Sequence, residues 1–224
     1  MLARISYAGA ALFVAAVVVA GALYPGYSHL KEAASQLAAT NSPSAPIMIV
    51  GFFALATSTV AAGLGLFQHL PVGAAAKIAG VLTLISGALL VVAGLARNSC
   101  SEWIGACKAA EEAGTIPLHH VVHDLVSLLL FLLLIAAVFT LARAVARNGA
   151  RKLVWPSIAV GVVSFVTMVA MVSGAVPAAS GLLQRVFLLV LFGWIIAVGP
   201  LTARIRAAGM PAAGAALQRP VEVL

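Results

Sequence analysis

The chain contains six continuous apolar stretches, and each is long enough to cross a bilayer as a helix. A hydrocarbon core of roughly 30 Å requires about 20 helical residues. The stretches do not alternate between apolar and polar residues, so they predict helices rather than the strands of a barrel. The composition agrees, because 63% of the residues are hydrophobic and 8% are charged. The predicted spans are Ile5–Leu23, Pro46–Phe67, Ala74–Ala96, Leu118–Ala142, Val154–Val176 and Gly181–Thr202.

The connections between these stretches are short, so the sequence predicts one all-α bundle of six transmembrane helices without a soluble domain. We assign residues 1–206 to this domain. Residues 207–224 are rich in alanine, glycine and proline and predict a flexible tail. A cleaved signal peptide is the alternative interpretation of the first stretch, but its length favours an uncleaved helix.

The basic residues predict the orientation of the bundle. Four of them occupy the fourth connection and two follow the last span. By the positive-inside rule, both termini are expected in the cytoplasm, with the chain crossing the inner (plasma) membrane several times. The net charge of +7 is scattered over the membrane flanks, so we expect membrane lipid rather than nucleic acid as the partner. These basic residues are Arg143, Arg147, Arg151, Lys152, Arg204 and Arg206.

The first connection predicts a short helix lying in the membrane interface. Pro25 and Gly26 end the first span with a turn. From Tyr27 to Ala38 the apolar and polar residues then fall on two opposite faces. His29 lies at the boundary between these faces. An ordinary interfacial histidine is the simplest interpretation, and three further histidines expected in the same leaflet favour a role as a ligand.

The strongest functional signal lies at the start of the fourth span. His119, His120, His123, Asp124 and Ser127 share one helical face, within an arc of about 140°. Ionisable groups at membrane depth usually face a bundle interior or a cavity. We therefore expect a functional site at this position.

Other polar residues are predicted at the same depth. Arg97 and Asn98 follow the third span, and Gln184 and Arg185 lie about one turn into the last span. A buried arginine requires a carboxylate, so Arg185 or Arg97 is expected to pair with Asp124. The residues expected to line one cavity are His119, His123, Asp124 and Arg185.

Both cysteines of the chain lie in the third connection. Cys100 and Cys107 are close in sequence and are expected on the outer side of the membrane, so they predict a disulfide. A thiolate metal site is the weaker alternative, because the spacing is not C-x-x-C and no histidine accompanies the pair.

Three short motifs carry a resemblance to a known family. They are Tyr24-Pro25-Gly26-Tyr27-Ser28-His29, the His119-His120 to His123-Asp124 segment, and Gln184-Arg185. Together they resemble the prokaryotic six-span membrane family catalogued as domain of unknown function 998. The likeness covers nearly the whole chain and implies a six-span fold, with no established activity.

A partial similarity links the chain to transmembrane zinc hydrolases of the alkaline ceramidase and adiponectin-receptor type. Those proteins combine an H-x-x-x-H helix with a distant third histidine, an aspartate and a serine. His119 and His123, with His29, Asp124 and Ser28, would take these roles here. The chain departs from that pattern because it has six spans rather than seven.

This pattern predicts a metal-dependent hydrolase acting on a lipid or other amphiphile. Two histidines four residues apart on a helix can share one zinc ion, which activates a bound water. The expected ligands are His119, His123 and His29, with His120 as the alternate ligand. The expected catalytic residues are Asp124 as base and Ser28 as donor to the oxyanion. The expected substrate-binding residues are Arg185, Gln184, Arg97 and Glu32.

Three alternatives stay open at this point. The cluster can be a structural or proton-handling network without metal. The protein can bind or transport an anionic amphiphile through Arg97 and Arg185 without catalysis. It can also hold a b-type haem between two histidines, although His69 is the one histidine expected near the other side of the membrane. The sequence leaves the oligomeric state open.

Overall fold

The computed structural model describes residues 1–100 and 105–209. Six of its helices are long and apolar enough to cross a membrane, which confirms the predicted fold class. Within the described residues the chain is helical with turns and contains no strand. The six long helices are α1 (Leu2–Ala22), α2 (Ala45–His69), α3 (Ala74–Leu95), α5 (Leu118–Arg147), α6 (Val154–Val172) and α7 (Ser180–Gly209).

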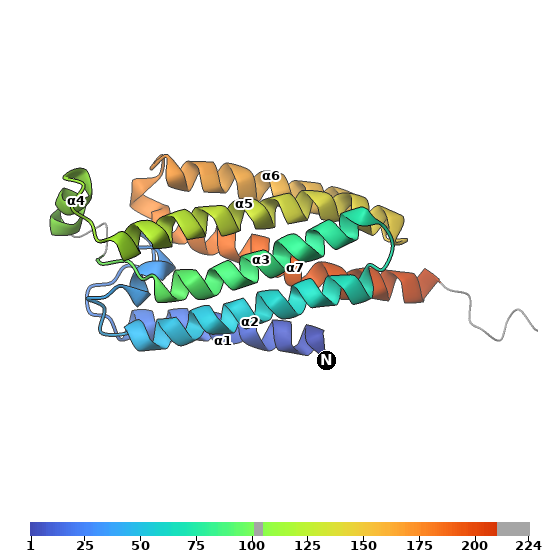
Figure 1. The fold of residues 1–224 in the computed structure, drawn as a ribbon, viewed down its shortest axis with the longest axis horizontal. Coiled ribbons are helices and arrows are strands. Elements are labelled where there is room, and N and C mark those ends of the chain that lie inside the picture. The colour runs from blue at the N-terminus through green and yellow to red at the C-terminus, as the bar shows by residue number, and fades with distance from the viewer. Residues whose placement is uncertain (101–104, 210–224) are drawn as a thin grey trace, which may run out of the picture.

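The long helices form one bundle in which sequence neighbours pack side by side (Figure 1). Helix α2 packs between α1 and α3, α5 between α3 and α6, and α7 follows α6. Helix α7 also returns to contact α2 and α5, which closes the bundle. Contact between α1 and α7 is slight by comparison.

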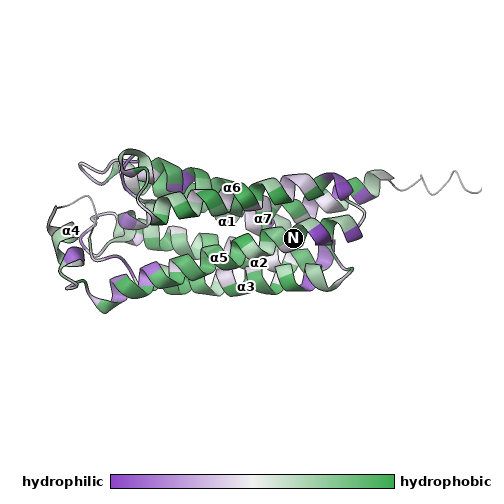
Figure 2. Cartoon of the chain, turned by 90° about the horizontal axis from the view of Figure 1, so that it is seen from above, coloured by the Kyte–Doolittle hydropathy of each residue, from purple (hydrophilic) through white to green (hydrophobic). Residues whose placement is uncertain are grey.

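Apolar residues cover the middle of the bundle, and hydrophilic residues gather at its two ends (Figure 2). At one end lie residues 23–44, 96–100, 105–117 and 173–179, beside the start of α5. We call it the histidine end. The other end carries residues 70–73 and 148–153 and the end of α7, and we call it the basic end.

Small residues allow α3 to approach α2 closely. A Cβ on Gly87 would lie 2.6 Å from Val60, and one on Gly94 would lie 2.9 Å from Phe52. Both distances are shorter than side chains tolerate, so glycine is required for this packing. Helix α3 is thereby held against α2 over several turns.

Some helix boundaries differ from the predicted ones. Helix α6 ends at Val172, before the predicted Val176, because Gly174 takes a positive φ of 65° that terminates the helix. A short helix, α4 (Gly105–Glu112), interrupts the third connection and was not predicted. Residues 207–209 continue α7, and the rest of the predicted tail, 210–224, lies outside the described residues.

The predicted interfacial helix from Tyr27 to Ala38 is wrong in extent. The structure has turns up to residue 32 and one short 3-10 helix, η1 (Ala34–Ala38). The Tyr27 hydroxyl donates to the carbonyls of Glu32 and Ala33, where the turns meet η1. These side-chain contacts compete with the backbone bonds of a continuous helix.

Candidate functional site

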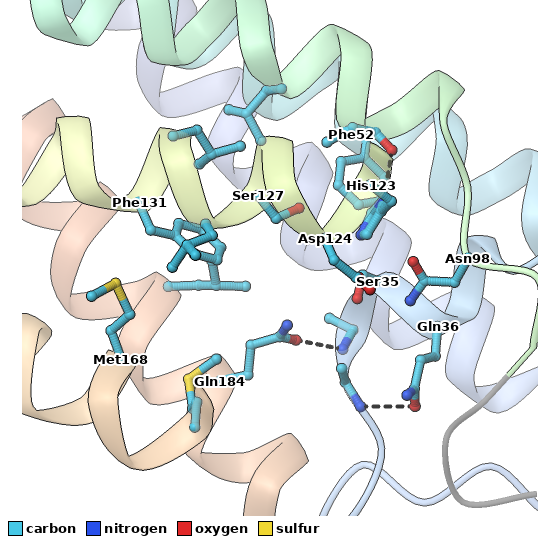
Figure 3. A pocket seen from close by; sticks show the side chains of 18 of the residues that line it. Ser35, Gln36, Phe52, Asn98, His123, Asp124, Ser127, Phe131, Met168 and Gln184 are labelled. Carbon is cyan, nitrogen blue, oxygen red and sulfur yellow. Dashed lines mark hydrogen bonds between the residues drawn. The ribbon is translucent and has the colours of Figure 1, made fainter. Parts of the chain in front are cut away.

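A cavity of about 530 Å³ lies among the helices at the histidine end. Helices α2, α3, α5, α6 and α7, together with α1 and η1, contribute to its wall. Its lining is divided: His123, Asp124 and Asn98 gather on one side, and Phe131 and Met168 lie on the other (Figure 3). The cavity therefore has a polar part and an apolar part.

The histidines of α5 join the start of that helix to the end of α3. His123 donates its Nδ1–H to the carbonyl of Ala93 at 2.8 Å, and His119 donates to that of Arg97 at 2.5 Å. Carbonyls at a helix C-terminus lack intrahelical partners, so these contacts cap α3. Because a carbonyl only accepts, both rings carry the proton on Nδ1 and keep Nε2 as an acceptor.

The hydrogen bonds of His120 run in the opposite direction, because its Nδ1 accepts rather than donates. Its Nδ1 accepts from the backbone N–H of Ser99 at 3.4 Å and lies 2.8 Å from the Ser99 hydroxyl. This arrangement places the proton on Nε2, which faces the Asp124 carboxylate at 3.6 Å. The His120 ring is buried, whereas 48% of the Asp124 side chain is exposed. The two groups lie within ion-pair distance but are not hydrogen-bonded, and the buried His120 Nε2 has no hydrogen-bond partner among the described residues.

The polar part of the cavity is rich in hydrogen-bond acceptors. The His123 ring lies beside Asp124 there (Figure 3), and Ser127 follows one turn along α5. Asn98 is buried, and its Oδ1 has no hydrogen-bond partner among the described residues. An unsatisfied buried carbonyl is unfavourable, so a donor group in the cavity would stabilise this wall.

Two glutamines stabilise η1: Gln184 joins it to α7, and Gln36 caps it from within. Gln184 accepts from the backbone N–H of Ala34 at 2.7 Å, and Gln36 accepts from that of Ala33 at 3.1 Å. Both glutamines also line the cavity (Figure 3). The predicted role of Gln184 at the site is therefore compatible with its position, and η1 covers the cavity at this end.

The Arg185 side chain forms hydrogen bonds with the first connection. Its Nη1 donates to the carbonyls of His29 and Glu32 at 2.9 and 2.8 Å, and to that of Gly181 at 2.8 Å. Its Nη2 donates to the Tyr27 hydroxyl at 2.5 Å, and the guanidinium lies 5.7 Å from that ring's centre. Arg185 thus fixes the segment on α7, and burial raises the Tyr27 pKa to about 12.

The four residues predicted to line one cavity are separated. His123 and Asp124 line the cavity described above, whereas Arg185 lines a second one between α1 and α7. His119 is engaged with the Arg97 carbonyl at the end of α3. Of the four residues, His123 and Asp124 line the same cavity as predicted, whereas His119 and Arg185 are not among the residues that line it.

Ser28 and Glu32, predicted at the site, lie together in a shallow depression of the first connection. The Glu32 carboxylate accepts from the backbone N–H of Ser28 at 2.9 Å, and the Ser28 hydroxyl accepts from that of Lys31 at 3.3 Å. These bonds stabilise the turn. A contact with substrate stays a prediction for both residues.

His29 packs against the end of α1. A Cβ on Gly21 would overlap its ring, and the ring meets Tyr27 edge-on at 5.1 Å between centroids. Burial, and then the nearby Arg185 guanidinium, lower the pKa of His29 below its usual value. His29 lines the cavity between α1 and α7 rather than the one beside His123.

Within the described residues, no three histidine, cysteine or acidic side chains are grouped as a metal site would require. The predicted ligand His29 borders a different cavity from His123. Zinc and haem both stay predictions. The predicted disulfide between Cys100 and Cys107 is present and links the segment after α3 to α4.

Sequence reasoning missed two contributors to this site. Ser99 binds His120, and its only signal was a polar residue directly after Arg97 and Asn98. Gln36 is buried in η1, where an amide within an otherwise alanine-rich segment was the available signal. Neither residue stands on a helical face with the histidines, so periodicity could not place them there.

Comparison with known proteins adds a family and no activity. No curated protein and no solved structure matches the chain. A family match extends from the first transmembrane helix into the last, over residues 7–200. The chain therefore belongs to the family described as "protein of unknown function (DUF998)".

Proposed function

We propose that the cavity beside His123 and Asp124 binds an amphiphile whose polar end donates hydrogen bonds or carries a positive charge. The observation that supports this most directly is the divided lining of a cavity of about 530 Å³. Ligand pockets commonly measure about 300–1,000 Å³ and combine an apolar wall with a few convergent polar groups.

The polar part of the cavity favours a donor over an anion. Asp124 supplies a carboxylate, and the Nε2 of His123 and the Oδ1 of Asn98 are acceptors. A long-chain amine or alcohol would satisfy these groups, whereas a carboxylate or phosphate would be repelled by Asp124. We therefore assign the ligand a cationic or hydroxyl-bearing head group.

The apolar part of the cavity suits a flexible chain. Phe131 of α5, Met168 and Met171 of α6 and Leu188 of α7 line it. Methionine side chains adapt to irregular shapes, so this wall can pack against chains of different length. We infer that the head group lies against α5 and that the chain extends toward α6 and α7.

Binding of dodecylamine, dodecanol and dodecanoate to the detergent-purified protein tests this proposal. We expect dodecylamine to bind most tightly, and Asp124→Asn to weaken its binding by about tenfold or more. Glu112→Gln removes the same charge from α4 at the same end and serves as the matched control. Tighter binding of dodecanoate, or unchanged amine binding in Asp124→Asn, would contradict the proposal.

A second candidate, metal-dependent hydrolysis, is favoured by the tautomers of His119 and His123. Both rings donate Nδ1–H to a carbonyl, which is the usual arrangement of a histidine that binds zinc through Nε2. Asp124 beside them could accept a proton from an attacking water. Elemental analysis tests this candidate: one zinc per chain, lost in His123→Ala, would support it. Metal-free protein whose melting ignores zinc and chelator would refute it.

A further inference from the structure

A second cavity, of about 370 Å³, lies between α1 and α7. Val14 and Val18 of α1 and Leu189 of α7 keep 46%, 58% and 63% of their surface exposed, so this groove faces the surrounding membrane. Helices α1 and α7 touch only slightly, which leaves the space between them open. The wall residues along the two helices include Val14, Val17, Val18, Leu189, Phe192 and Ile196.

The groove is apolar along its length and polar at one end. Arg185 and His29 line it at the histidine end. The Nη atoms of Arg185 donate to three carbonyls and the Tyr27 hydroxyl, so none of these hydrogen bonds is to a carboxylate. Its Nε is buried and has no hydrogen-bond partner among the described residues. An anionic oxygen at this end would be attracted by the charge of the guanidinium.

The groove matches the depth of one membrane leaflet. From Arg185 to Ile196 it follows α7 for about 16 Å, at roughly 1.5 Å per residue. Half of a hydrocarbon core of roughly 30 Å is about 15 Å. A single acyl chain whose head group lies beside Arg185 would therefore fill the groove without crossing the bilayer midplane.

We propose that this groove binds one acyl chain of an acidic phospholipid, with a phosphate oxygen accepting from Arg185. Four residues line both this groove and the central cavity and therefore lie between the two spaces: Phe13, Ala34, Leu55 and Leu188. The lipid would fasten α1 to α7 where protein contacts are few. It would also reinforce the attachment of the first connection to α7.

Gly193 provides a selective test. It lines the groove, and a Cβ added there would meet no heavy atom within 4 Å. Gly193→Trp should therefore place an indole in the groove without displacing the bundle. Gly193→Ala, which adds a methyl in open space, and Val186→Trp, on an exposed part of α7, are the matched controls.

The measurement is the thermal unfolding of delipidated protein in detergent with added phosphatidylglycerol, phosphatidylcholine or glycerol phosphate. Phosphatidylglycerol should raise the Tm more than phosphatidylcholine does, and glycerol phosphate, which has no chains, should leave it unchanged. Gly193→Trp should weaken phosphatidylglycerol binding by about tenfold or more, with both controls unchanged. Asp124→Asn should retain the stabilisation by phosphatidylglycerol. A failure of amphiphile binding in the central cavity can therefore be distinguished from a failure of lipid binding in the groove.

Three outcomes would overturn the inference. Equal stabilisation by the two phospholipids would show that Arg185 selects no charge. Full stabilisation by glycerol phosphate would point to a phosphate site without a chain. An unchanged phosphatidylglycerol effect in Gly193→Trp would show that the lipid lies elsewhere on the protein.

Discussion

The spaces beside two histidines at opposite ends of the bundle differ greatly in volume. At the histidine end the helices enclose about 530 Å³, whereas the space among α1, α2 and α7 near the basic end is about 10 Å³. The smaller volume holds about one water molecule at most. Alanine and glycine residues, among them Ala62, Gly65 and Gly199, line the smaller space and let the helices approach closely.

Two histidines illustrate what this difference means. His69, at the basic end, packs against α7, where a Cβ on Gly199 would lie 3.2 Å from its ring. His123, at the histidine end, meets the edge of Phe52 at 6.0 Å between centroids and borders the cavity. The residue type is the same, but only His123 has open space in front of it. Local packing rather than residue type therefore decides which histidine can meet a ligand.

The largest effect is expected from the two arginines that bond to carbonyls at opposite ends. Arg185→Ala removes four hydrogen bonds, to three carbonyls and to the Tyr27 hydroxyl, and should lower the unfolding free energy by about 4 kcal/mol. Arg206→Ala removes one long, exposed contact of 3.5 Å to His69 and should cost less than about 1 kcal/mol. The stability of the two variants is compared through the fraction of protein that stays monodisperse after heating in detergent. Equal losses of stability in Arg185→Ala and Arg206→Ala would contradict the asymmetry between the two ends.

Added volume should also distinguish the two ends. Gly199→Leu forces a side chain against His69 and should destabilise the bundle by about 3 kcal/mol. Ser127→Leu extends into the central cavity and should change stability by less than about 0.5 kcal/mol, while it prevents binding of dodecylamine. Thermal unfolding and amine binding are measured on both variants. If Ser127→Leu unfolds the protein as much as Gly199→Leu, the cavity is not open space.

The histidine end alone carries a covalent link among the described residues. Replacing Cys100 and Cys107 together by serine should lower stability by about 2 kcal/mol, because the short closed loop restricts the unfolded chain. Alkylation of unfolded, non-reduced protein should label neither cysteine. Labelling of both in protein from an oxidising compartment would refute the disulfide.

The smallest effect is a pH dependence of the histidine end. Burial and Arg185 lower the pKa of His29, so the folded state favours the neutral ring. This contribution is present above the unfolded pKa of about 6.5 and is lost as the pH falls through that value toward the folded one. We expect a modest fall in Tm on acidification that is reduced in His29→Gln. If the Tm of His29→Gln falls with pH as steeply as that of the unmodified protein, His29 is not the source of the pH dependence.

The sequence predicted the spans well, because twenty or so continuous apolar residues have few alternatives in a membrane. It also predicted the face of His123 and Asp124, because helical periodicity fixes relative directions. It misplaced Arg185, since depth along two helices does not determine which side of a helix faces which cavity. The first connection was also misjudged, because long-range bonds from Arg185 and local bonds from the Tyr27 hydroxyl outweigh its amphipathic pattern.

The most direct test of amphiphile binding beside Asp124 is photolabelling with dodecylamine that carries a diazirine at its chain end. The label should appear near Phe131, Met168 or Leu188, and excess dodecylamine, but not dodecanoate, should prevent it. Asp124→Asn should lose the labelling, and Glu112→Gln should keep it. Labelling confined to membrane-facing residues such as Val163 and Phe165, or unaffected by Asp124→Asn, would contradict binding in the central cavity.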